Sequence, residues 1–398
     1  MKFGLIPKLL IGLAAGIAIG LLDVDWMIRI TETARILLGG IIKFFIPLIL
    51  IAFIAAGIAD LRGKTGKLLS FTVGLSYVDT IIASALAALA AYLMIPSFGI
   101  VTTTGEEAAA IAEPFIEINI PPIMDVMSAL MLAFVLGIGA TWGKSPTITY
   151  AVTEFREIII RCINKLVIPI LPFFIATIFA GVAAKGDLFS NIAIFGKMFG
   201  LIIGMQLLWL IIEYVLAGIV FKQNPWTMFK ALIPAYFTAI GTMSSAVTMP
   251  VALKQAQKVK YMDRDIVDFV IPLCNTVHLS GAAIGITVGA ATVSMFTTGE
   301  LPSITTMIAF VILLGIIEVG AVGVPGGSVM ASLGILQSVL GFDEAALGLM
   351  ITLFAIQDGF ATATNVTGDG ALAMIINRFF GKKQGPDVPA SSDVTVDA

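Results

Sequence analysis

Long, almost uninterrupted apolar runs constrain this sequence more than any other feature. Examples are FFIPLILIAFIAAGIA, from Phe44, and LIIGMQLLWLIIEYVLAGIVF, from Leu201. A helix needs about 20 such residues to cross the hydrocarbon core of a bilayer. Hydrophobic residues make up 58% of the 398 residues and charged residues only 12%. No stretch alternates with a period of two as a membrane β-barrel does. The sequence therefore predicts an all-α integral membrane protein.

We expect eight transmembrane helices and two re-entrant helical hairpins. The spanning segments are predicted at residues 4–22, 36–58, 68–95, 122–142, 157–182, 192–221, 265–290 and 343–380. We interpret the first segment as a retained helix, because it is long for a signal peptide and lacks a clear small-x-small cleavage site. Cys162 and Cys274 both lie in apolar segments, which indicates neither a disulfide framework nor a thiolate metal site.

Two further apolar runs, at 231–255 and 304–340, are interrupted by GTMSSAVTMP and GVPGGS. Each half is too short to span, and open backbone at membrane depth is tolerated only where protein or a water-filled cavity satisfies it. Such interruptions are typical of hairpins that enter a binding site in the middle of a transporter. The alternative for either sequence is a simple bend with no ligand.

Basic residues predict the orientation, because Lys and Arg accumulate on the cytoplasmic side. With the N-terminus inside, three basic residues fall in outer loops, namely Arg29, Arg35 and Lys185. The inner loops and tails hold Lys2, Lys8, Arg62, Lys64, Lys67, Lys144, Lys222, Lys230, Lys254, Lys258, Lys260, Arg264, Arg378, Lys382 and Lys383. We therefore expect a multi-pass protein of the cell (inner) membrane with both termini cytoplasmic, and a disordered tail at 384–398.

A few polar side chains fall inside the apolar segments, where an ionised group costs about 2.5–3.5 kcal/mol on insertion scales. The ionisable ones are Asp79, Glu213, His278, Glu318, Asp358 and Asp369, and the neutral ones of the same kind are Ser244, Ser245, Thr362 and Asn365. Because of that cost, these residues are functional candidates.

The segment QDGFATATNVTGDG contains a polar stripe. Asp358, Thr362, Asn365 and Asp369 are offset by 0, 4, 7 and 11 residues. At about 100° per residue they fall near 0, 40, 340 and 20° on one helix face. One interpretation is a hydrogen-bonded seam between helices. The other, which we favour, is a site for a bound cation, because the two carboxylates have no intramembrane base near them in sequence.

These motifs, in this order, resemble the dicarboxylate/amino acid:cation symporter family, which has the glutamate transporter fold. The resemblance covers essentially the whole chain. It is carried by MSSAVTMP, by GVPGGS where the family has GVPGAG, by PLCNTVHLSGAA where it has PLGATINMDGTA, and by DGFATATNVTGD where it has DMxRTxxNVTGD. It implies a homotrimer with an elevator mechanism, in which a transport domain moves against a scaffold domain and carries an amino acid and sodium across the membrane.

The resemblance also implies a division of the chain. Residues 1–66 and 121–190 would form the scaffold. Residues 67–120, with the third helix and an outer loop, and 191–383, with both hairpins and the last three helices, would form the transport domain.

The family's substrate residues fall on identifiable positions here. Asp358 would bind the substrate ammonium and Asn365 its α-carboxylate, beside Thr362. The hairpin tips would close over the substrate through Ser244 and Ser245 on one side and Val324 and Gly326 on the other.

Sodium ligands are implied in the same way. Asp369 and Asn365, with backbone oxygens near Asn275, would hold one ion in an all-oxygen site. The carbonyls of Thr276 and Leu279, with those from Glu318 to Ala321, would hold a second. The side chain of Glu318 would either add charge there or face water at the mouth.

Departures from the family pattern concern the substrate side chain first. The arginine that clamps a side-chain carboxylate is replaced by Ala361, and the threonine that assists it by Ala282. A charge-assisted hydrogen bond is worth about 1.5–3 kcal/mol, and an unpaired buried carboxylate costs more. We therefore expect neutral amino acids; the alternatives are an acidic amino acid or dicarboxylate symporter and an amino acid-gated anion channel.

The third cation region of the family is also altered. NMDG is replaced by HLSG, which puts His278 and Ser280 where an asparagine and a cation-binding aspartate stand, and the facing pair on the third helix becomes Asp79-Thr80. Asp79 could still ligate sodium, with Ser280 and Thr80 as neutral ligands. In a second interpretation His278, protonated or hydrogen-bonded to Asp79, replaces the cation, which lowers the sodium number or introduces proton coupling. In a third, His278 is neutral and bonded to backbone in a packed bundle.

The expected number of sodium ions is two. Glu213 is interpreted as an interhelical or lipid-facing group rather than a ligand.

Other functions fit the sequence less well. His278 and Ser280 do not form the pattern of a serine hydrolase, since residues two apart do not share a helical face. A net charge of −3 gives no support to nucleic-acid binding.

Overall fold

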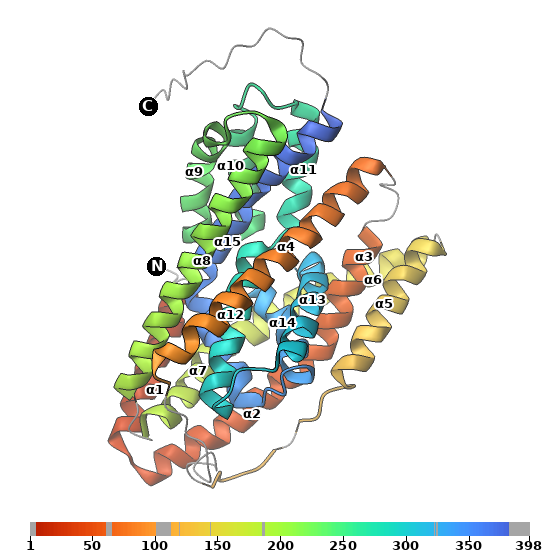
Figure 1. Ribbon diagram of the computed structural model, residues 1–398. Coiled ribbons are helices and arrows are strands. Elements are labelled where there is room, and N and C mark those ends of the chain that lie inside the picture. Colours follow the sequence, from red (N-terminus) through yellow and green to blue (C-terminus); the bar gives the residue numbers. More distant parts are fainter. Residues whose placement is uncertain are drawn as a thin grey trace.

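The computed structural model describes residues 5–60, 66–100, 113–118, 120–143, 145–184, 188–321, 323 and 325–381. Throughout these ranges the ordered elements are helical, as predicted (Figure 1). The predicted tail at 384–398 and the hairpin residue Val324 lie outside them. The α-helices are α1 (Leu5–Leu22), α2 (Asp25–Leu50), α3 (Ala56–Asp60), α4 (Lys67–Met94), α5 (Val126–Trp142), α6 (Pro146–Cys162), α7 (Ile168–Ala184), α8 (Leu188–Phe221), α9 (Pro225–Thr242), α10 (Ser245–Ala256), α11 (Arg264–Val277), α12 (Ser280–Thr298), α13 (Ile304–Gly320), α14 (Gly327–Ser338) and α15 (Glu344–Phe380).

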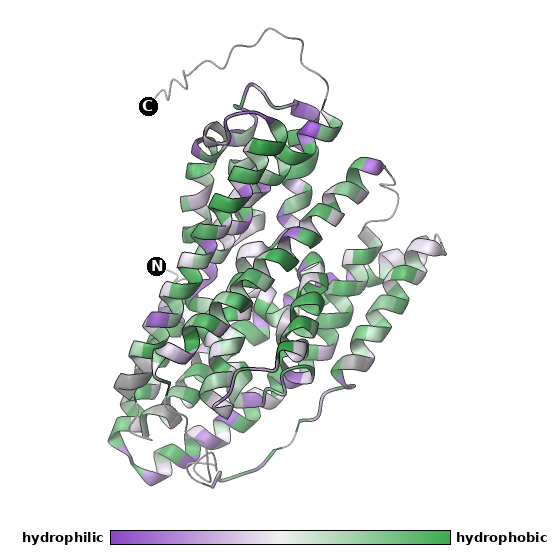
Figure 2. Cartoon of the chain, in the orientation of Figure 1, coloured by the Kyte–Doolittle hydropathy of each residue, from purple (hydrophilic) through white to green (hydrophobic). Residues whose placement is uncertain are grey.

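Within the described residues, six helical stretches are long and apolar enough to cross a membrane, and six of the eight predicted spans lie on them. The spans predicted at 4–22 and 122–142 lie on the shorter apolar helices α1 and α5. Figure 2 shows hydrophobic residues covering most of the helices. The chain is a multi-pass membrane protein, while the count of eight crossings stays a prediction.

Helix α2 begins at Asp25, well before the span predicted from residue 36. Its first turns are polar, so the hydropathy pattern misses them. Arg35 Nε donates to Glu32 Oε2 at 2.9 Å, three residues away on the same face. The hydroxyl of Thr33 donates to the carbonyl of Arg29 at 2.7 Å. Local pairs of this kind support a helix where apolar burial does not.

Both predicted chain interruptions are confirmed, and the structure shows a third. The first hairpin turns at Met243, which has a φ of 50°, and Ser244 caps α10. The second turns between α13 and α14, where Gly326 has a φ of 72° that favours glycine. The seventh predicted span is broken at His278 and Leu279, between α11 and α12.

Helix α1 packs unusually closely against α7. Glycines recur every fourth residue on α1, at Gly12, Gly16 and Gly20, and face the α7 backbone. A Cβ atom at Gly16 would lie only 2.2 Å from the carbonyl oxygen of Ala176. In a membrane, small residues let helix backbones approach and gain van der Waals contact. This contact joins the first helix to the fifth predicted span.

The central element of the polar region is α15, drawn in blue in Figure 1. It packs against α8, α9, α11 and α12, and its residues from Ala346 to Asn377 are almost all buried. Its N-terminal half joins a large apolar core shared with α2, α7 and α14, and its C-terminal half a second core with α8 to α11. A polar stripe on this helix is therefore enclosed by protein.

Candidate functional site

The tips of the two hairpins meet. Ser244 Oγ donates to the carbonyl oxygen of Gly323 at 2.9 Å, and the Ala246 N–H donates to the same oxygen at 3.3 Å. A Cβ atom on Gly323 would lie 2.9 Å from the Cβ of Ser245, so this approach requires glycine. Both serines are buried. The sequence predicted that each tip enters the interior, and the structure brings the two together.

The predicted stripe on α15 faces this junction. Asp358 Oδ2 accepts the N–H of Gly326 on the second hairpin at 2.7 Å, and Thr362 Oγ1 donates to the carbonyl of Asp358 at 2.8 Å. Asn365 Oδ1 accepts the backbone N–H groups of Gly281 at 2.8 Å and Ala282 at 3.3 Å. These contacts use the Asn365 oxygen and leave its NH2 group to meet a carboxylate. They also give the stripe the hydrogen bonds that the seam interpretation expects.

The two alanines that the resemblance assigns to the substrate side chain are buried. Ala282 is 2% exposed and Ala361 0%. The start of α12 packs directly on α15 here, since a Cβ on Gly281 would lie 2.6 Å from the carbonyl oxygen of Ala361. The side chains at these positions are therefore small and apolar beside Asn365.

The resemblance implies one sodium position at Asp369 and Asn365. The Asn365 oxygen already accepts two N–H groups. Asp369 Oδ1 lies 3.0 Å from His278 Nδ1. Asn365 Oδ1 and one of the two Asp369 carboxylate oxygens thus have protein partners, and a sodium ion at this position stays a prediction.

The second implied position fits a hard cation better. Helices α11 and α13 both end there, and the last carbonyls of a helix lack intrahelical partners. Neither carboxylate oxygen of Glu318 has a hydrogen-bond partner among the described residues, nor has Asn275 Oδ1. Glu318 is 0% exposed, so the interpretation that it faces water at the mouth is wrong. Backbone oxygens of Thr276 and Ala321, with the Glu318 carboxylate, are oxygen ligands of the kind that a hard cation takes, while the Leu279 carbonyl also accepts the Ala283 N–H at 3.0 Å.

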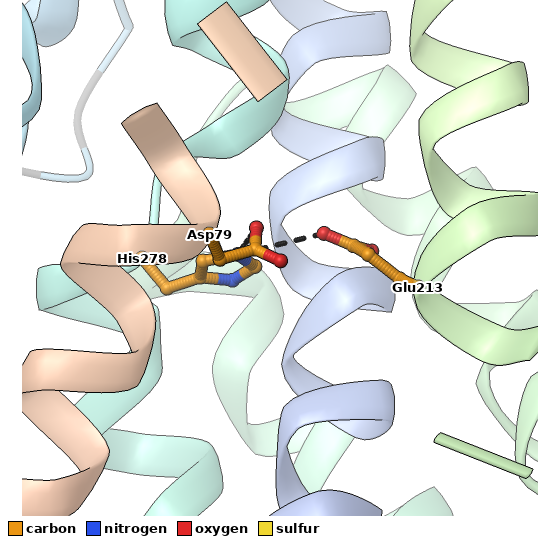
Figure 3. A group of neighbouring side chains, drawn as sticks. All are labelled: Asp79, Glu213 and His278. Carbon is orange, nitrogen blue, oxygen red and sulfur yellow. Dashed lines mark hydrogen bonds and ion pairs between the residues drawn. The ribbon is translucent and has the colours of Figure 1, made fainter. Parts of the chain in front are cut away.

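His278 is the centre of a buried cluster on the other side of the broken helix (Figure 3). Its Nδ1 lies 3.0 Å from Asp369 Oδ1, and its Nε2 lies 2.9 Å from Asp79 Oδ2. The expectation that Asp79 and His278 are within reach is confirmed. The third interpretation, a histidine bonded only to backbone, is wrong for this ring. Thr80 is also buried, and its hydroxyl has no hydrogen-bond partner in the described part of the chain.

Glu213 belongs to the same cluster, which the sequence did not predict. It is 2% exposed, its Oε1 accepts the Ser280 hydroxyl at 3.2 Å, and it lies 3.6 Å from His278 Nε2. A lipid-facing Glu213 is therefore wrong. The one signal in the sequence was an ionisable residue inside a long apolar helix, which does not name its partners.

Three more buried polar residues were missed. Trp209 Nε1 donates to Asp79 Oδ2 at 3.2 Å. Gln206 Nε2 donates to the carbonyl of Gly281 at 3.0 Å and to Gln357 Oε1 at 2.9 Å. Gln206 and Trp209 lie on the apolar helix α8, and Gln357 directly precedes Asp358 on α15. Together with Ser280, which donates to Glu213, they make a polar layer beside the helix break.

These features define the class of membrane protein to which the chain belongs. A multi-pass membrane protein whose two hairpins and one broken helix converge on a buried polar stripe has the architecture of a secondary transporter. Residues 5–379 match the family model described as "Sodium:dicarboxylate symporter family". The chain belongs to this family, which is one of symporters and not of enzymes.

The sequence identity to individual relatives is low. Excitatory amino acid transporter 1 of Homo sapiens is 25% identical over 265 residues, which are 65% of this chain and 48% of that protein. Excitatory amino acid transporter 2 of Mus musculus is 26% identical over 265 residues, 63% of this chain and 45% of that protein. The matched region spans about half the length of these relatives.

Proposed function

We propose that this protein is a secondary active transporter that carries amino acids across the membrane by symport with sodium. Membership of the symporter family supports this. The observation that carries the proposal is the junction of both hairpin tips with α15. Asp358 and Asn365 there offer a carboxylate for an ammonium group and an amide for a carboxylate, the two charged groups that every amino acid has.

Neutral amino acids are the proposed substrates. Ala361 and Ala282 stand beside Asn365 where a second carboxylate on the substrate would need a cationic or hydroxyl partner. Without one, a buried carboxylate loses about 1.5–3 kcal/mol of charge-assisted bonding, and its desolvation costs more. That difference is at least about tenfold in affinity.

One sodium ion is proposed at the ends of α11 and α13, held by backbone oxygens of Thr276, Leu279 and Ala321 with Glu318. When bound, sodium would couple its own movement down its gradient to the transport of the amino acid. In the altered region the His278 ring stands between Asp79 and Asp369 and replaces an alkali ion. The sodium number is then lower than in a transporter that keeps all three of the family's sites, with two as the upper count.

The elevator mechanism and the trimer are proposed on the family resemblance. Packing within the chain supports the division into two domains: α1 packs on α7 and α5 on the α2–α3 segment, while α4 and α8 pack on α12. The assignment of 1–66 and 121–190 to the scaffold follows this pattern. An inner-membrane location with both termini cytoplasmic remains the proposal made from the basic residues.

The test is uptake of a panel of labelled amino acids into proteoliposomes, with and without sodium and pH gradients. We expect sodium-dependent, saturable uptake of one or more neutral amino acids and at least about tenfold weaker uptake of aspartate. Aspartate uptake with an affinity equal to that of every neutral amino acid would contradict the neutral assignment. Amino acid-gated anion current without stoichiometric uptake would contradict the transporter itself.

A further inference from the structure

We propose that Asp79, Glu213 and His278 form a binding site for one divalent transition-metal ion, of which Zn²⁺ is the best match. This inference concerns the buried cluster alone and does not rest on the proposed transport activity. The family resemblance implies an alkali cation in this region, and it assigns neither a transition metal here nor a role to Glu213.

The three ligand atoms are already gathered. His278 Nε2 lies 2.9 Å from Asp79 Oδ2 and 3.6 Å from Glu213 Oε1, and all three atoms lie within 4.8 Å of one another. Ligands at about 2.0–2.2 Å from a tetrahedral metal are about 3.4 Å apart. The observed separations bracket that value. Figure 3 shows the carboxylates of Asp79 and Glu213 directed toward the ring from different helices.

The chemistry of the donors favours a transition metal over an alkali ion. Imidazole suits zinc and its neighbours, whereas sodium-like hard ions take oxygen ligands. A neutral ring that donates its Nδ1 proton to Asp369 presents an Nε2 lone pair toward two carboxylate oxygens. A metal ion bound there takes the place of the proton that Nε2 otherwise shares with Asp79 Oδ2 at 2.9 Å.

Each ligand also has the outer partner that metal sites require. Metal-binding histidines almost always donate their other N–H to a carboxylate or carbonyl, and ligating carboxylates are themselves hydrogen-bonded. Here Asp369 meets His278 Nδ1. Trp209 donates to Asp79 Oδ2 and Ser280 to Glu213 Oε1, the same oxygens that face the ring, and each of these oxygens keeps a further lone pair for an ion. Hydrogen bonds therefore orient all three ligands, which is not expected of acidic residues that lie close together by chance.

Glu213 supplies the observation that points to a missing ligand. Its Oε2 is buried and has no hydrogen-bond partner in the residues described. Gly368 on α15 makes room for this carboxylate, because a Cβ there would lie 2.6 Å from Glu213 Oε2 and 3.0 Å from His278 Cε1. The oxygen measured against the ring is Oε1, so an ion would satisfy Oε2 if the Glu213 carboxylate bound it through both oxygens; an unpaired buried oxygen otherwise costs free energy.

Access is available from one side. The side chain of Asp79 is 13% exposed, whereas those of His278 and Glu213 are 0% and 1% exposed. An ion entering past Asp79 would join α4 and α8 to the break between α11 and α12. We therefore expect it to stabilise these helices against one another.

The test uses the purified full-length protein in lipid nanodiscs, treated with a chelator and then with Zn²⁺ or Co²⁺ alone. Retained metal is measured by elemental analysis after desalting, and Co²⁺ by its visible absorption. We expect about one ion per chain, a Co²⁺ spectrum of mixed nitrogen and oxygen ligands, and quenching of the buried Trp209. Excess Na⁺ should not displace the ion.

Variants assign the site. His278→Asn and Glu213→Gln should each lose the retained ion, while Glu32→Gln, a buried carboxylate on α2 that pairs with Arg35, should keep it. Trp209→Phe keeps all three ligands, and should weaken binding about 10–100-fold by removing one orienting hydrogen bond. It serves as the readout if the ligand variants do not fold. No retained ion in the wild type, equal retention in every variant, or displacement by Na⁺ would each overturn the proposal.

Discussion

His278 Nε2 lies 2.9 Å from Asp79 Oδ2, although the two residues are 199 positions apart in the chain. The contact joins the broken middle of one helical span to the face of α4. Its position coincides with the region where the family resemblance implies a cation. A histidine ring and a new carboxylate thus stand together where the aspartate of the family motif is replaced by Ser280.

Removing the ring should change cation coupling. His278→Asn restores the amide of the family motif and frees Asp79 and Asp369 to meet an ion. We expect the Hill slope for sodium in the uptake assay to rise, and the reversal potential to shift accordingly. If Asp79 itself ligates sodium, Asp79→Thr should instead lower the slope. Unchanged slopes in both variants would show that neither residue takes part in coupling.

Restoring the arginine at position 361 should change substrate choice. In Ala361→Arg with Ala282→Thr, a guanidinium can form charge-assisted bonds with a substrate carboxylate worth about 1.5–3 kcal/mol. We expect aspartate affinity to increase about 10- to 100-fold relative to that for neutral amino acids. Competition of aspartate against a labelled neutral substrate measures this. Ala361→Leu adds bulk without charge and is the control; an equal gain of aspartate binding in that variant would refute the explanation.

An ion pair links the two proposed domains. Lys43 Nζ on α2 lies 2.8 Å from Glu344 Oε1 at the start of α15, and both side chains are about a quarter exposed. A pair this exposed is worth about 0–1 kcal/mol, so Lys43→Met should shift the balance between domain positions by up to about fivefold. The change should appear in the uptake rate and in spin-label distances between α2 and α15.

A second ion pair, which lies within one helix, serves as the control for this experiment. The pair of Arg161 with Glu157 lies within α6, so Arg161→Met should leave both readouts unchanged. Exchanging the charges, in Lys43→Glu with Glu344→Lys, should restore the wild-type values. Failure of the exchanged pair to do so would mean that the effect of Lys43 is not electrostatic.

The contact between α1 and α7 should not tolerate a methyl group. In Gly16→Ala the new Cβ would meet the Ala176 carbonyl at 2.2 Å, and we expect a loss of about 1–3 kcal/mol of stability. Gly204 on α8 is exposed and has nothing within 4 Å of the position that a Cβ would occupy, so Gly204→Ala should be neutral or slightly stabilising. Thermal unfolding in detergent compares the two. Equal melting temperatures would contradict the close packing of α1.

The sequence by itself determined the membrane class, the interruptions at Ser244 and Gly326, and the stripe from Asp358 to Asp369. These follow from composition and helical periodicity, which are local properties of the chain. Compared with the family pattern, it also located the change at His278 and pointed to Asp79 on the facing helix. It misplaced the start of α2, because polar helical turns at a span's end carry no hydropathy signal.

Only the tertiary structure decided which distant groups meet. Glu213 reaches Ser280 and His278 because α8 packs against α15 and α12, and no pattern within α8 encodes that neighbour. The contact of Gly323 with Ser244 likewise depends on how two hairpins approach each other. A polar residue inside an apolar segment indicates that its side chain needs a hydrogen-bond partner. Which partner it finds is set by the packing of helices far apart in the chain.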